Sequence, residues 1–216
     1  MHIPDGFLDA RTWIACSAVS AVGLAIITKK AQKSMEEKMV PMIALTSAFI
    51  FVAQMFNFPV AGGTSGHLLG ALLTAVLIGP WAGALCMSLV LIVQCFVFQD
   101  GGLTALGANI LNMSFIGLFS GYLIFRLIHK TFGEKGFLFG CILGAWISVV
   151  AGAIACAIEL VISGTVPMGA AIIAMGGIHS LIGIGEAAIT FAVVSFVYKV
   201  RPELIATYKM SASLEG

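Results

Sequence analysis

Long runs of apolar residues alternate with short polar segments along the whole chain. A helix needs about 20 apolar residues to cross the hydrocarbon core of a bilayer, which is about 30 Å thick. The pattern therefore predicts an all-α integral membrane protein, with a single membrane domain over residues 1–210 and a short tail over 211–216. The predicted spans lie near residues 8–28, 40–57, 67–79, 81–98, 107–130, 137–163 and 169–200.

The third predicted span is the shortest, and Gly79-Pro80 separates it from the fourth. Glycine and proline interrupt helices and promote turns. We predict that the two runs form a tight helical hairpin, and the alternative is one long kinked helix.

Composition supports a membrane protein. The 216 residues are 60% hydrophobic and 10% charged, whereas soluble domains carry about 25% charged residues. The first apolar run has no basic segment before it and no small-residue cleavage site after it, so we expect Met1 to be retained. The end of the tail, Leu214-Glu215-Gly216, resembles the remnant of an expression tag.

Cysteines and basic residues exclude other classes of protein. The five cysteines all lie inside apolar runs without metal-binding spacing, which predicts packing roles and no disulfides. They are Cys16, Cys86, Cys95, Cys141 and Cys156. The net charge is only +1, and no basic stripe with interleaved aromatic residues is present, which argues against nucleic-acid binding.

The basic residues also predict an orientation. With seven spans, all Lys and Arg residues except Arg11 fall on one side of the membrane, whereas six spans would scatter them over both sides. Because Lys and Arg are enriched in cytoplasmic loops, we expect the N-terminus to lie outside and the C-terminus in the cytoplasm.

This topology gives the external face three polar segments, residues 1–7, 57–67 and 99–107, which contain no Lys or Arg. Their histidines and aspartates suit a cation. The glycines of the second segment allow close backbone approach, and irregular backbone at membrane depth needs surrounding protein or a water-filled cavity. We therefore predict a re-entrant binding loop.

Met1 and His2 together form a potential chelator. The terminal amine, the His2 amide nitrogen and His2 Nδ1 can close a five-membered and a six-membered ring around one ion, leaving a fourth in-plane position open. Nitrogen ligands in a plane suit Ni(II) or Cu(II), whereas Zn(II) prefers a tetrahedron. The alternative is an ordinary initiator methionine followed by a histidine without a ligand role.

His67 is the candidate for the fourth ligand. It ends the glycine-rich segment and is predicted to begin the third helix, with its ring directed back toward the external face. A capping or packed histidine is the alternative. Pro4 and Asp5-Gly6 supply a turn that could fold the N-terminus inward toward His67.

Asn109, Asn112 and Gln99 are candidates to hold the second ring nitrogen of His67, because ligand histidines commonly donate that nitrogen to a neighbouring group. Asp100 could attract cations to the external mouth, although a solvated loop aspartate is the plainer interpretation.

Three further ionisable residues lie within predicted spans, where they are costly and usually functional. His179 and Glu186 are seven residues apart and share one face of the last helix, and Glu159 lies near the outer end of the sixth. Glu186 is interpreted equally well as a hydrogen-bond brace to an Asn or Ser and as a group that supports a metal ligand or gates the site. We expect His179 to be a brace or a partner of a metal ligand and not a direct ligand.

Three motifs carry a family resemblance: MHIPDGFL at the start, NFPVAGGTSGHLLG in the second external segment and HSLIGIGEAAIT in the last span. They resemble the CbiM/NikM family, the substrate-binding S components of energy-coupling factor (ECF) cobalt and nickel importers. The resemblance implies a six-helix core plus an additional N-terminal helix, with the N-terminus inserted into the bundle. It also implies metal ligation by the Met1 amine, the His2 amide and ring, and His67.

The chain has no phosphate-binding loop, so ATP hydrolysis would have to come from partners. The resemblance implies a transmembrane coupling (T) subunit, two ATP-binding (A) subunits, and in some systems a small accessory membrane subunit, in the cytoplasmic (inner) membrane of a prokaryote. It also implies that Ala44 and Ala48, whose four-residue spacing permits close helix approach, face the coupling subunit.

We therefore expect a binding subunit that captures Ni(II), or secondarily Co(II), with no catalytic cofactor and no enzymatic activity of its own. Cu(II) would also bind such a site. One alternative is a self-sufficient proton-coupled transporter that uses His179, Glu186 and Glu159, although internal repeats typical of such folds are not evident. Another is an intramembrane metalloenzyme, for which the HExxH pattern is missing.

Overall fold

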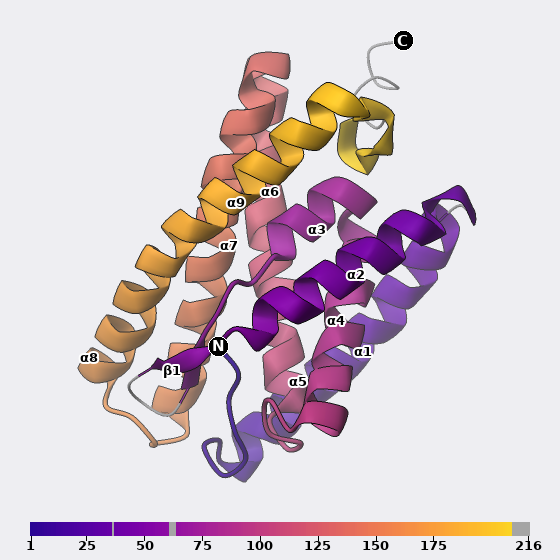
Figure 1. Ribbon diagram of the computed structural model, residues 1–216. Helices are drawn as coiled ribbons and strands as arrows, with labels where there is room; N and C mark the ends of the chain where they lie inside the picture. Colours follow the sequence, from indigo (N-terminus) through magenta and orange to yellow (C-terminus); the bar gives the residue numbers. More distant parts are fainter. Residues whose placement is uncertain (36, 61–63, 209–216) are drawn as a thin grey trace.

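The computed structural model describes residues 1–35, 37–60 and 64–208, without the side chain of Lys38. The glycines at 62 and 63, Lys209 and the predicted tail over 211–216 lie outside the described residues. Among these residues, helices form a bundle around a short central helix, and one small hairpin of two strands lies near the N-terminus (Figure 1).

The elements follow the predicted apolar runs. The helices are α1 (Ala10–Ser34), α2 (Val40–Met55), α3 (Ala71–Ile78), α4 (Pro80–Phe98), α5 (Leu106–Asn109), α6 (Leu118–Phe132), α7 (Glu134–Ile162), α8 (Met168–Ala171) and α9 (Ile178–Val200). A π-helical segment, Ile110–Gly117, joins α5 to α6, and another, Ile172–Gly177, joins α8 to α9. Short 3₁₀ turns occupy Glu37–Met39 and Pro202–Leu204.

The protein is a multi-pass membrane protein. Within the described ranges, five continuous helical stretches are long and apolar enough to cross a membrane. They are Ala10–Ser34, Pro80–Phe98, Leu106–Phe132, Glu134–Ile162 and Met168–Val200. Helix α2 is apolar but has only 16 residues. A topology of seven crossings remains a prediction.

The predicted span over 67–79 is wrong in its extent. Helix α3 begins only at Ala71 and has eight residues, which rise about 12 Å at 1.5 Å per residue and cannot cross a bilayer. Its N-terminal boundary is set by Gly70, whose φ of 73° lies in the left-handed region. All eight residues of α3 are buried, so this helix is part of the protein core.

Helices α3 and α4 form the predicted hairpin. The chain reverses at Gly79, and Pro80 is the first residue of α4, where its missing N–H costs nothing. A Cβ added to Gly83 would lie 3.2 Å from Ala75 Cα, so the two helices pack backbone to backbone. This packing excludes the alternative of one long kinked helix.

The two-stranded hairpin precedes α3. Strands β1 (Phe58–Val60) and β2 (Thr64–Gly66) pair antiparallel, with Pro59 opposite Ser65. Residues 67–70 then run without regular structure to the start of α3. The hairpin and this connection bring His67 into the interior of the bundle, where it is 2% exposed.

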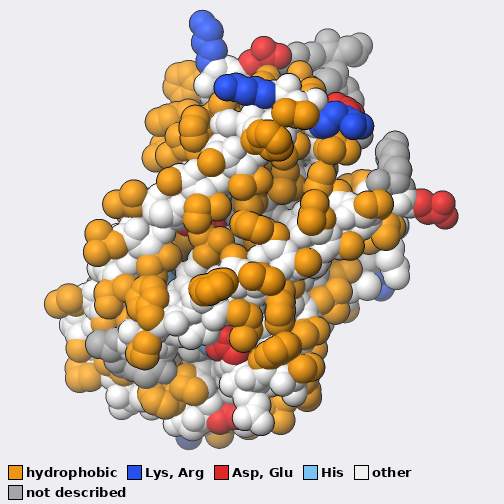
Figure 2. Space-filling model, in the orientation of Figure 1, with side chains coloured by type: hydrophobic (Ala, Val, Ile, Leu, Met, Phe, Trp, Pro, Cys, Tyr) orange, Lys and Arg blue, Asp and Glu red, His pale blue; other side chains and the backbone are white. Residues whose placement is uncertain are grey.

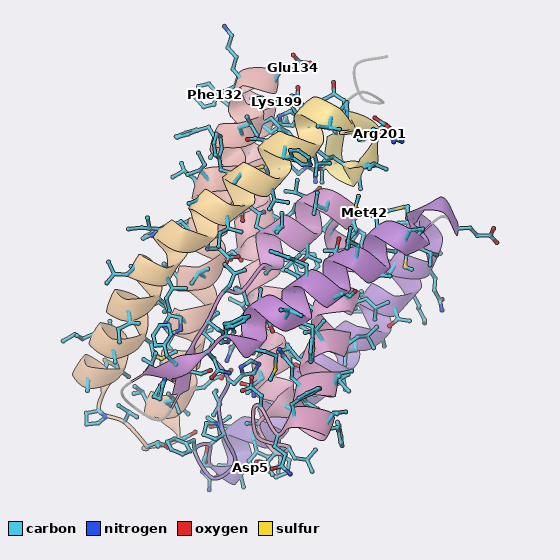
Figure 3. The ribbon with its side chains drawn as sticks, in the orientation of Figure 1. Asp5, Met42, Phe132, Glu134, Lys199 and Arg201 are labelled. Atoms are coloured by element: carbon cyan, nitrogen blue, oxygen red, sulfur yellow. The ribbon has the colours of Figure 1, made fainter. Side chains whose placement is uncertain are left out.

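The molecule is apolar on its outside and charged at its ends. Exposed large hydrophobic residues occur on the long helices, and hydrophobic side chains cover much of the surface between the two ends (Figure 2). Glu134, Lys199 and Arg201 lie at the upper end, and Asp5 lies at the opposite end (Figure 3). The division matches the charge asymmetry that predicts the membrane orientation, which itself remains a prediction.

Candidate metal-binding site

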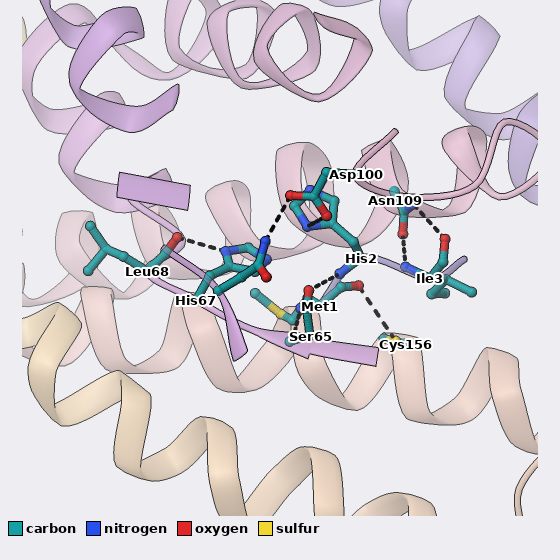
Figure 4. Close-up of polar contacts among 10 residues, drawn as sticks. Met1, His2, Ile3, Ser65, His67, Leu68, Asp100, Asn109 and Cys156 are labelled. Atoms are coloured by element: carbon teal, nitrogen blue, oxygen red, sulfur yellow. Dashed lines mark hydrogen bonds and ion pairs between the residues drawn. The ribbon is translucent and has the colours of Figure 1, made fainter. Parts of the chain in front are cut away.

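The first three residues are buried inside the bundle, beside strand β2. Met1 and Ile3 are both 0% exposed and His2 is 4% exposed. The Met1 amine donates hydrogen bonds to the carbonyl oxygen of Ser65 and, at 3.2 Å, to its Oγ. The His2 amide lies 3.3 Å from the same Oγ (Figure 4). Two of the predicted donor nitrogens therefore face one serine.

Asn109 holds the other side of the N-terminal segment. The Ile3 amide donates to Asn109 Oδ1 at 2.8 Å, and Asn109 Nδ2 donates to the Ile3 carbonyl at 3.1 Å. The side-chain amide thus pairs with the backbone of Ile3 as a neighbouring strand would. Asn109 orients the N-terminus, and its predicted role as the partner of His67 is wrong.

The loop after α4 encloses the same segment. The Gly102 amide donates to the Ile3 carbonyl at 2.8 Å, and a Cβ added to Gly102 would lie 2.3 Å from the Asp5 nitrogen. The Asp5 carboxylate accepts hydrogen bonds from the Leu103 and Thr104 amides and from Thr104 Oγ1. A surface pocket of about 340 Å³ lies between Asp5 and this loop. The N-terminus is therefore fixed from several directions.

The rings of His2 and His67 lie side by side. Their centroids are 4.7 Å apart and their planes differ by 28°. Two imidazoles at right angles around one ion, with metal–nitrogen distances of about 2.0 Å, would place their ring centres about 4.5 Å apart, whereas opposite positions would need about 6 Å. The observed spacing fits adjacent positions of one coordination plane.

The ring nitrogens have few other partners. His67 Nδ1 lies 2.8 Å from the Leu68 carbonyl oxygen, which can only accept, so this nitrogen carries the proton. His67 Nε2 is then left with a free lone pair, and it is buried without a hydrogen-bond partner. Both ring nitrogens of His2 also lack a hydrogen-bond partner. Buried orphan acceptors of this kind are expected where an ion binds.

Burial keeps the donor nitrogens neutral. Desolvation lowers the pKa of the Met1 amine from its ordinary 8.0 to about 5 and the pKa of the His2 ring from 6.5 to about 3. Burial likewise holds the pKa of His67 well below its usual value. Because a metal binds the unprotonated nitrogen, the buried environment favours ligation over protonation. Asp100 Oδ1, 3.4 Å from His2 Nδ1, adds a negative charge beside the site.

Two further predictions about His67 are wrong. It lies four residues before α3 and does not begin this helix. Its Nδ1 partner is the Leu68 carbonyl, not one of the predicted side-chain amides. Asn112 instead donates to Glu159 at 2.6 Å, and Gln99 is exposed at the end of α4 with a φ of 56°.

The three intramembrane ionisable residues have separate surroundings. His179 is 0% exposed, and its Nδ1 lies 2.8 Å from the Met175 carbonyl. It interacts electrostatically with His67, as expected for a neighbour of the site. The Glu186 carboxylate accepts hydrogen bonds from the backbone amides of Leu69 and Gly70, not from an Asn or Ser. Glu159 accepts from Cys16 and Asn112.

The sequence analysis missed two residues that lie near the site. Ser65 acts through its backbone as well as its hydroxyl group, so a short strand inside a glycine-rich run gives no hint of it. Gln94 is 0% exposed, both polar atoms of its side chain lack hydrogen-bond partners, and it interacts with the His2 ring. A glutamine inside an apolar span could have been flagged by the cost of burying it.

The remaining predicted residues lie elsewhere. Ala44 and Ala48 are exposed on α2, a helix that also exposes Leu45, Phe49 and Val52. Over the described part of the chain, no cluster of three or more His, Cys, Asp or Glu side chains could hold a metal. A site with two histidine rings and two main-chain nitrogens does not need such a cluster.

Comparison with known proteins gives consistent matches. Residues 2–204 match the family model CbiM, described as the cobalt uptake substrate-specific transmembrane region. The chain is 31% identical to the fused nickel transport protein NikMN of Rhodobacter capsulatus, over 100% of this chain and 67% of that protein. It is 39% identical to cobalt transport protein CbiM 2 of Pelobacter propionicus, over 64% of this chain and 63% of the relative.

A solved structure has the same fold. A crystal structure described as a transition metal transporter superposes with a TM-score of 0.87 at 38% sequence identity, covering 100% of both chains. A truncated form of a transition metal transporter superposes with a TM-score of 0.86 and covers 92% of this chain.

Proposed function

This chain belongs to the CbiM family, and from that membership we propose that it captures Ni(II) at the external face of a prokaryotic cytoplasmic membrane and delivers it inward as the substrate-binding subunit of an ATP-driven ECF importer. The ligands in this proposal are the Met1 amine, the His2 amide nitrogen, His2 Nδ1 and His67 Nε2. The ion is the transported substrate and not a resident cofactor.

The observation that carries the proposal is the burial of unpartnered ring nitrogens of His2 and His67 next to the N-terminal amine. The rings of His2 and His67 are 4.7 Å apart, and His67 Nε2 has no hydrogen-bond partner. The Met1 amine and His2 amide share Ser65 on the adjoining strand. No carboxylate or thiolate ligand is required, because deprotonation of the His2 amide supplies one negative charge and Asp100 lies beside the ring.

Nickel is preferred on the basis of geometry. Four nitrogen donors that share one plane suit Ni(II) and Cu(II), whereas Mg(II) and Ca(II) prefer oxygen ligands. Co(II) is the second candidate, since relatives are named for cobalt as well as for nickel transport. Cu(II) would bind at least as tightly by the Irving–Williams order, so availability would decide between them in a cell.

Partner subunits follow from the same proposal. Energy would come from two ATP-binding subunits through a transmembrane coupling subunit, whose contact surface includes the exposed Ala44 and Ala48 on α2. Small residues allow close approach between membrane helices. A small accessory membrane subunit would be a further partner in this proposal.

The test is metal binding by the purified chain with a tag at the C-terminus only. We expect one Ni(II) per protein by metal analysis and titration calorimetry, with Mg(II) unable to compete. His67→Ala should lower the Ni(II) affinity by at least about 100-fold, because it removes one ligand and leaves a planar position to water.

His129→Ala is the matched control. His129 stacks on Phe125 near the end of α6, away from the N-terminal segment, so its removal should leave the affinity unchanged. Equal nickel binding by wild type and His67→Ala would refute the proposed ligand set. Uptake into liposomes by the chain alone, driven by a pH gradient, would instead support the proton-coupled alternative.

A further inference from the structure

A buried carboxylate contacts the chain immediately after His67. Glu186 on α9 is 1% exposed, and both of its oxygens accept hydrogen bonds from main-chain amides. We propose that Glu186 is a positioning residue for the metal ligand His67, acting through the peptide group between Leu68 and Leu69. This inference rests on the proposed function.

The contacts form a continuous chain through one peptide group. The Leu69 N–H donates to Glu186 Oε2 at 2.8 Å. The carbonyl oxygen of the same peptide group, that of Leu68, accepts from His67 Nδ1 at 2.8 Å. One end of this peptide is therefore held by the carboxylate, and the other end holds the imidazole.

A second contact fixes the orientation of the carboxylate. The Gly70 N–H donates to Glu186 Oε1 at 2.6 Å. Gly70 has a φ of 73°, and this turn directs two successive amides toward α9. Because one carboxylate binds both amides, the peptide that carries the Leu68 carbonyl cannot rotate without breaking a buried hydrogen bond.

The arrangement has a chemical consequence for His67. Ligand histidines commonly donate their second ring nitrogen to a carboxylate or carbonyl, which fixes the tautomer and raises the basicity of the ligand nitrogen. Here the Glu186 carboxylate binds the N–H of the peptide group whose carbonyl oxygen accepts from His67. A hydrogen bond that a peptide N–H donates polarises the peptide group and strengthens the hydrogen bond that its carbonyl accepts. The unpartnered Nε2 of His67 then becomes the stronger donor to metal.

Glu159 supplies an internal control. It is also a buried glutamate on a long helix, 7% exposed, but it accepts from Cys16 and Asn112 and does not contact the 67–70 segment. A glutamine at either position keeps the size of the side chain. In Glu186→Gln, however, the side-chain NH₂ group would face the N–H of Leu69 or Gly70, and two donors cannot form a hydrogen bond with each other.

The experiment is a double-mutant cycle on Ni(II) affinity, measured by calorimetry in detergent. Glu186→Gln should weaken binding by about 10- to 100-fold, the usual effect of removing a partner of a ligand histidine. In a His67→Ala background the same change should have less than about a threefold effect, because the residue acts through His67. Glu159→Gln should leave the Ni(II) affinity unchanged in both backgrounds.

A spectroscopic measurement separates positioning from general support of the fold. The ligand-field absorption band of bound Ni(II) should shift in Glu186→Gln and stay in place in Glu159→Gln. If Glu186→Gln does not fold, Glu186→Asp should retain the charge and show a smaller shift in the same direction. Equal losses in the wild-type and His67→Ala backgrounds, or an unshifted band, would overturn the inference. Absence of nickel binding by the wild type would instead contradict the proposed function itself.

Discussion

The N-terminal segment and helix α2 reverse the relation between polarity and burial that holds in soluble proteins. Residues 1–3 include the terminal amine and an imidazole, yet none of them is more than 4% exposed. Helix α2 and the residue after it are almost entirely apolar, yet Phe56 is 79% and Leu45 67% exposed.

The reversal follows from the surroundings of each region, which are lipid chains for α2 and protein for the N-terminal segment. Lipid chains accept exposed apolar side chains without cost, so α2 gains little by packing inward. The polar N-terminal segment avoids hydrocarbon only if its groups are satisfied inside the protein. The polar groups of the N-terminal segment therefore lie inside the protein, where Ser65, Asn109 and Gly102 are their hydrogen-bond partners.

Lengthening the buried N-terminal segment should have the largest effect and would remove the contrast between the two regions. Two glycines added before Met1 should abolish high-affinity Ni(II) binding, with a loss of at least about 1,000-fold, because they move the terminal amine away from His2 and leave no room for it at Ser65. Calorimetry would measure the loss. Five residues added after Gly216 serve as the control, and unchanged affinity in the N-terminally extended protein would contradict the proposed chelate.

Truncating one large apolar side chain in each region sharpens the comparison. Ile3→Ala should destabilise the protein by about 2–5 kcal/mol, as expected for a large side chain in a packed core, because Ile3 is 0% exposed. Phe56→Ala should change stability by less than about 0.5 kcal/mol. Chemical denaturation in a mild detergent measures both, and equal effects would show that the segment is not packed as described.

Gly102 tests how closely the external loop encloses the segment. A Cβ at this position would lie 2.3 Å from the Asp5 nitrogen and 2.6 Å from the Pro4 carbonyl carbon. Gly102→Ala should cost about 1–3 kcal/mol through overpacking and weaken nickel binding by roughly tenfold. Gly185→Ala on α9, where a Cβ has nothing within 4 Å, is the control. A nickel affinity equal to wild type in Gly102→Ala would show that the loop adapts.

The smallest expected effect depends on pH. Hydrogen bonds from Thr104, with one from the Leu103 amide, hold the pKa of the exposed Asp5 carboxyl below its ordinary 3.8. A lowered folded-state pKa stabilises the protein above the unfolded value, and this contribution is lost as pH falls through the folded value. Asp5→Asn should therefore melt a few degrees below wild type at pH 6, and the difference should shrink as the pH falls below 3.8. A difference in melting temperature that does not decrease with falling pH would exclude this cause.

Much of the fold could be predicted from the sequence because membrane burial leaves a strong pattern. Each predicted apolar run contains a helix within the described residues, and the α3–α4 hairpin follows from Gly79-Pro80. Helix α3 was predicted too long since residues 67–70 are as compatible with helix as with extended chain. Glu186 determines the outcome by binding two amides of that stretch.

The site was predictable only in part. The proximity of Met1, His2 and His67 follows from placing their segments on one side of the membrane. The roles of Ser65 and Asn109 could not be predicted, because both act on main-chain groups. Side-chain patterns carry information about apolar faces, whereas a contact to the backbone depends on coordinates alone.

The contacts of Met1 also constrain how the protein can be made. Its partners lie far along the chain: Ser65 is 64 residues away, and Cys156, whose thiol lies 3.9 Å from the Met1 carbonyl, is 155 residues away. At a translation rate of about 5–20 residues per second, α7 is polymerised roughly 8–30 s after the N-terminal segment. During this interval the amine has no enclosure and is accessible to ribosome-associated processing enzymes. Maturation of the amine must therefore finish before the later helices close over it.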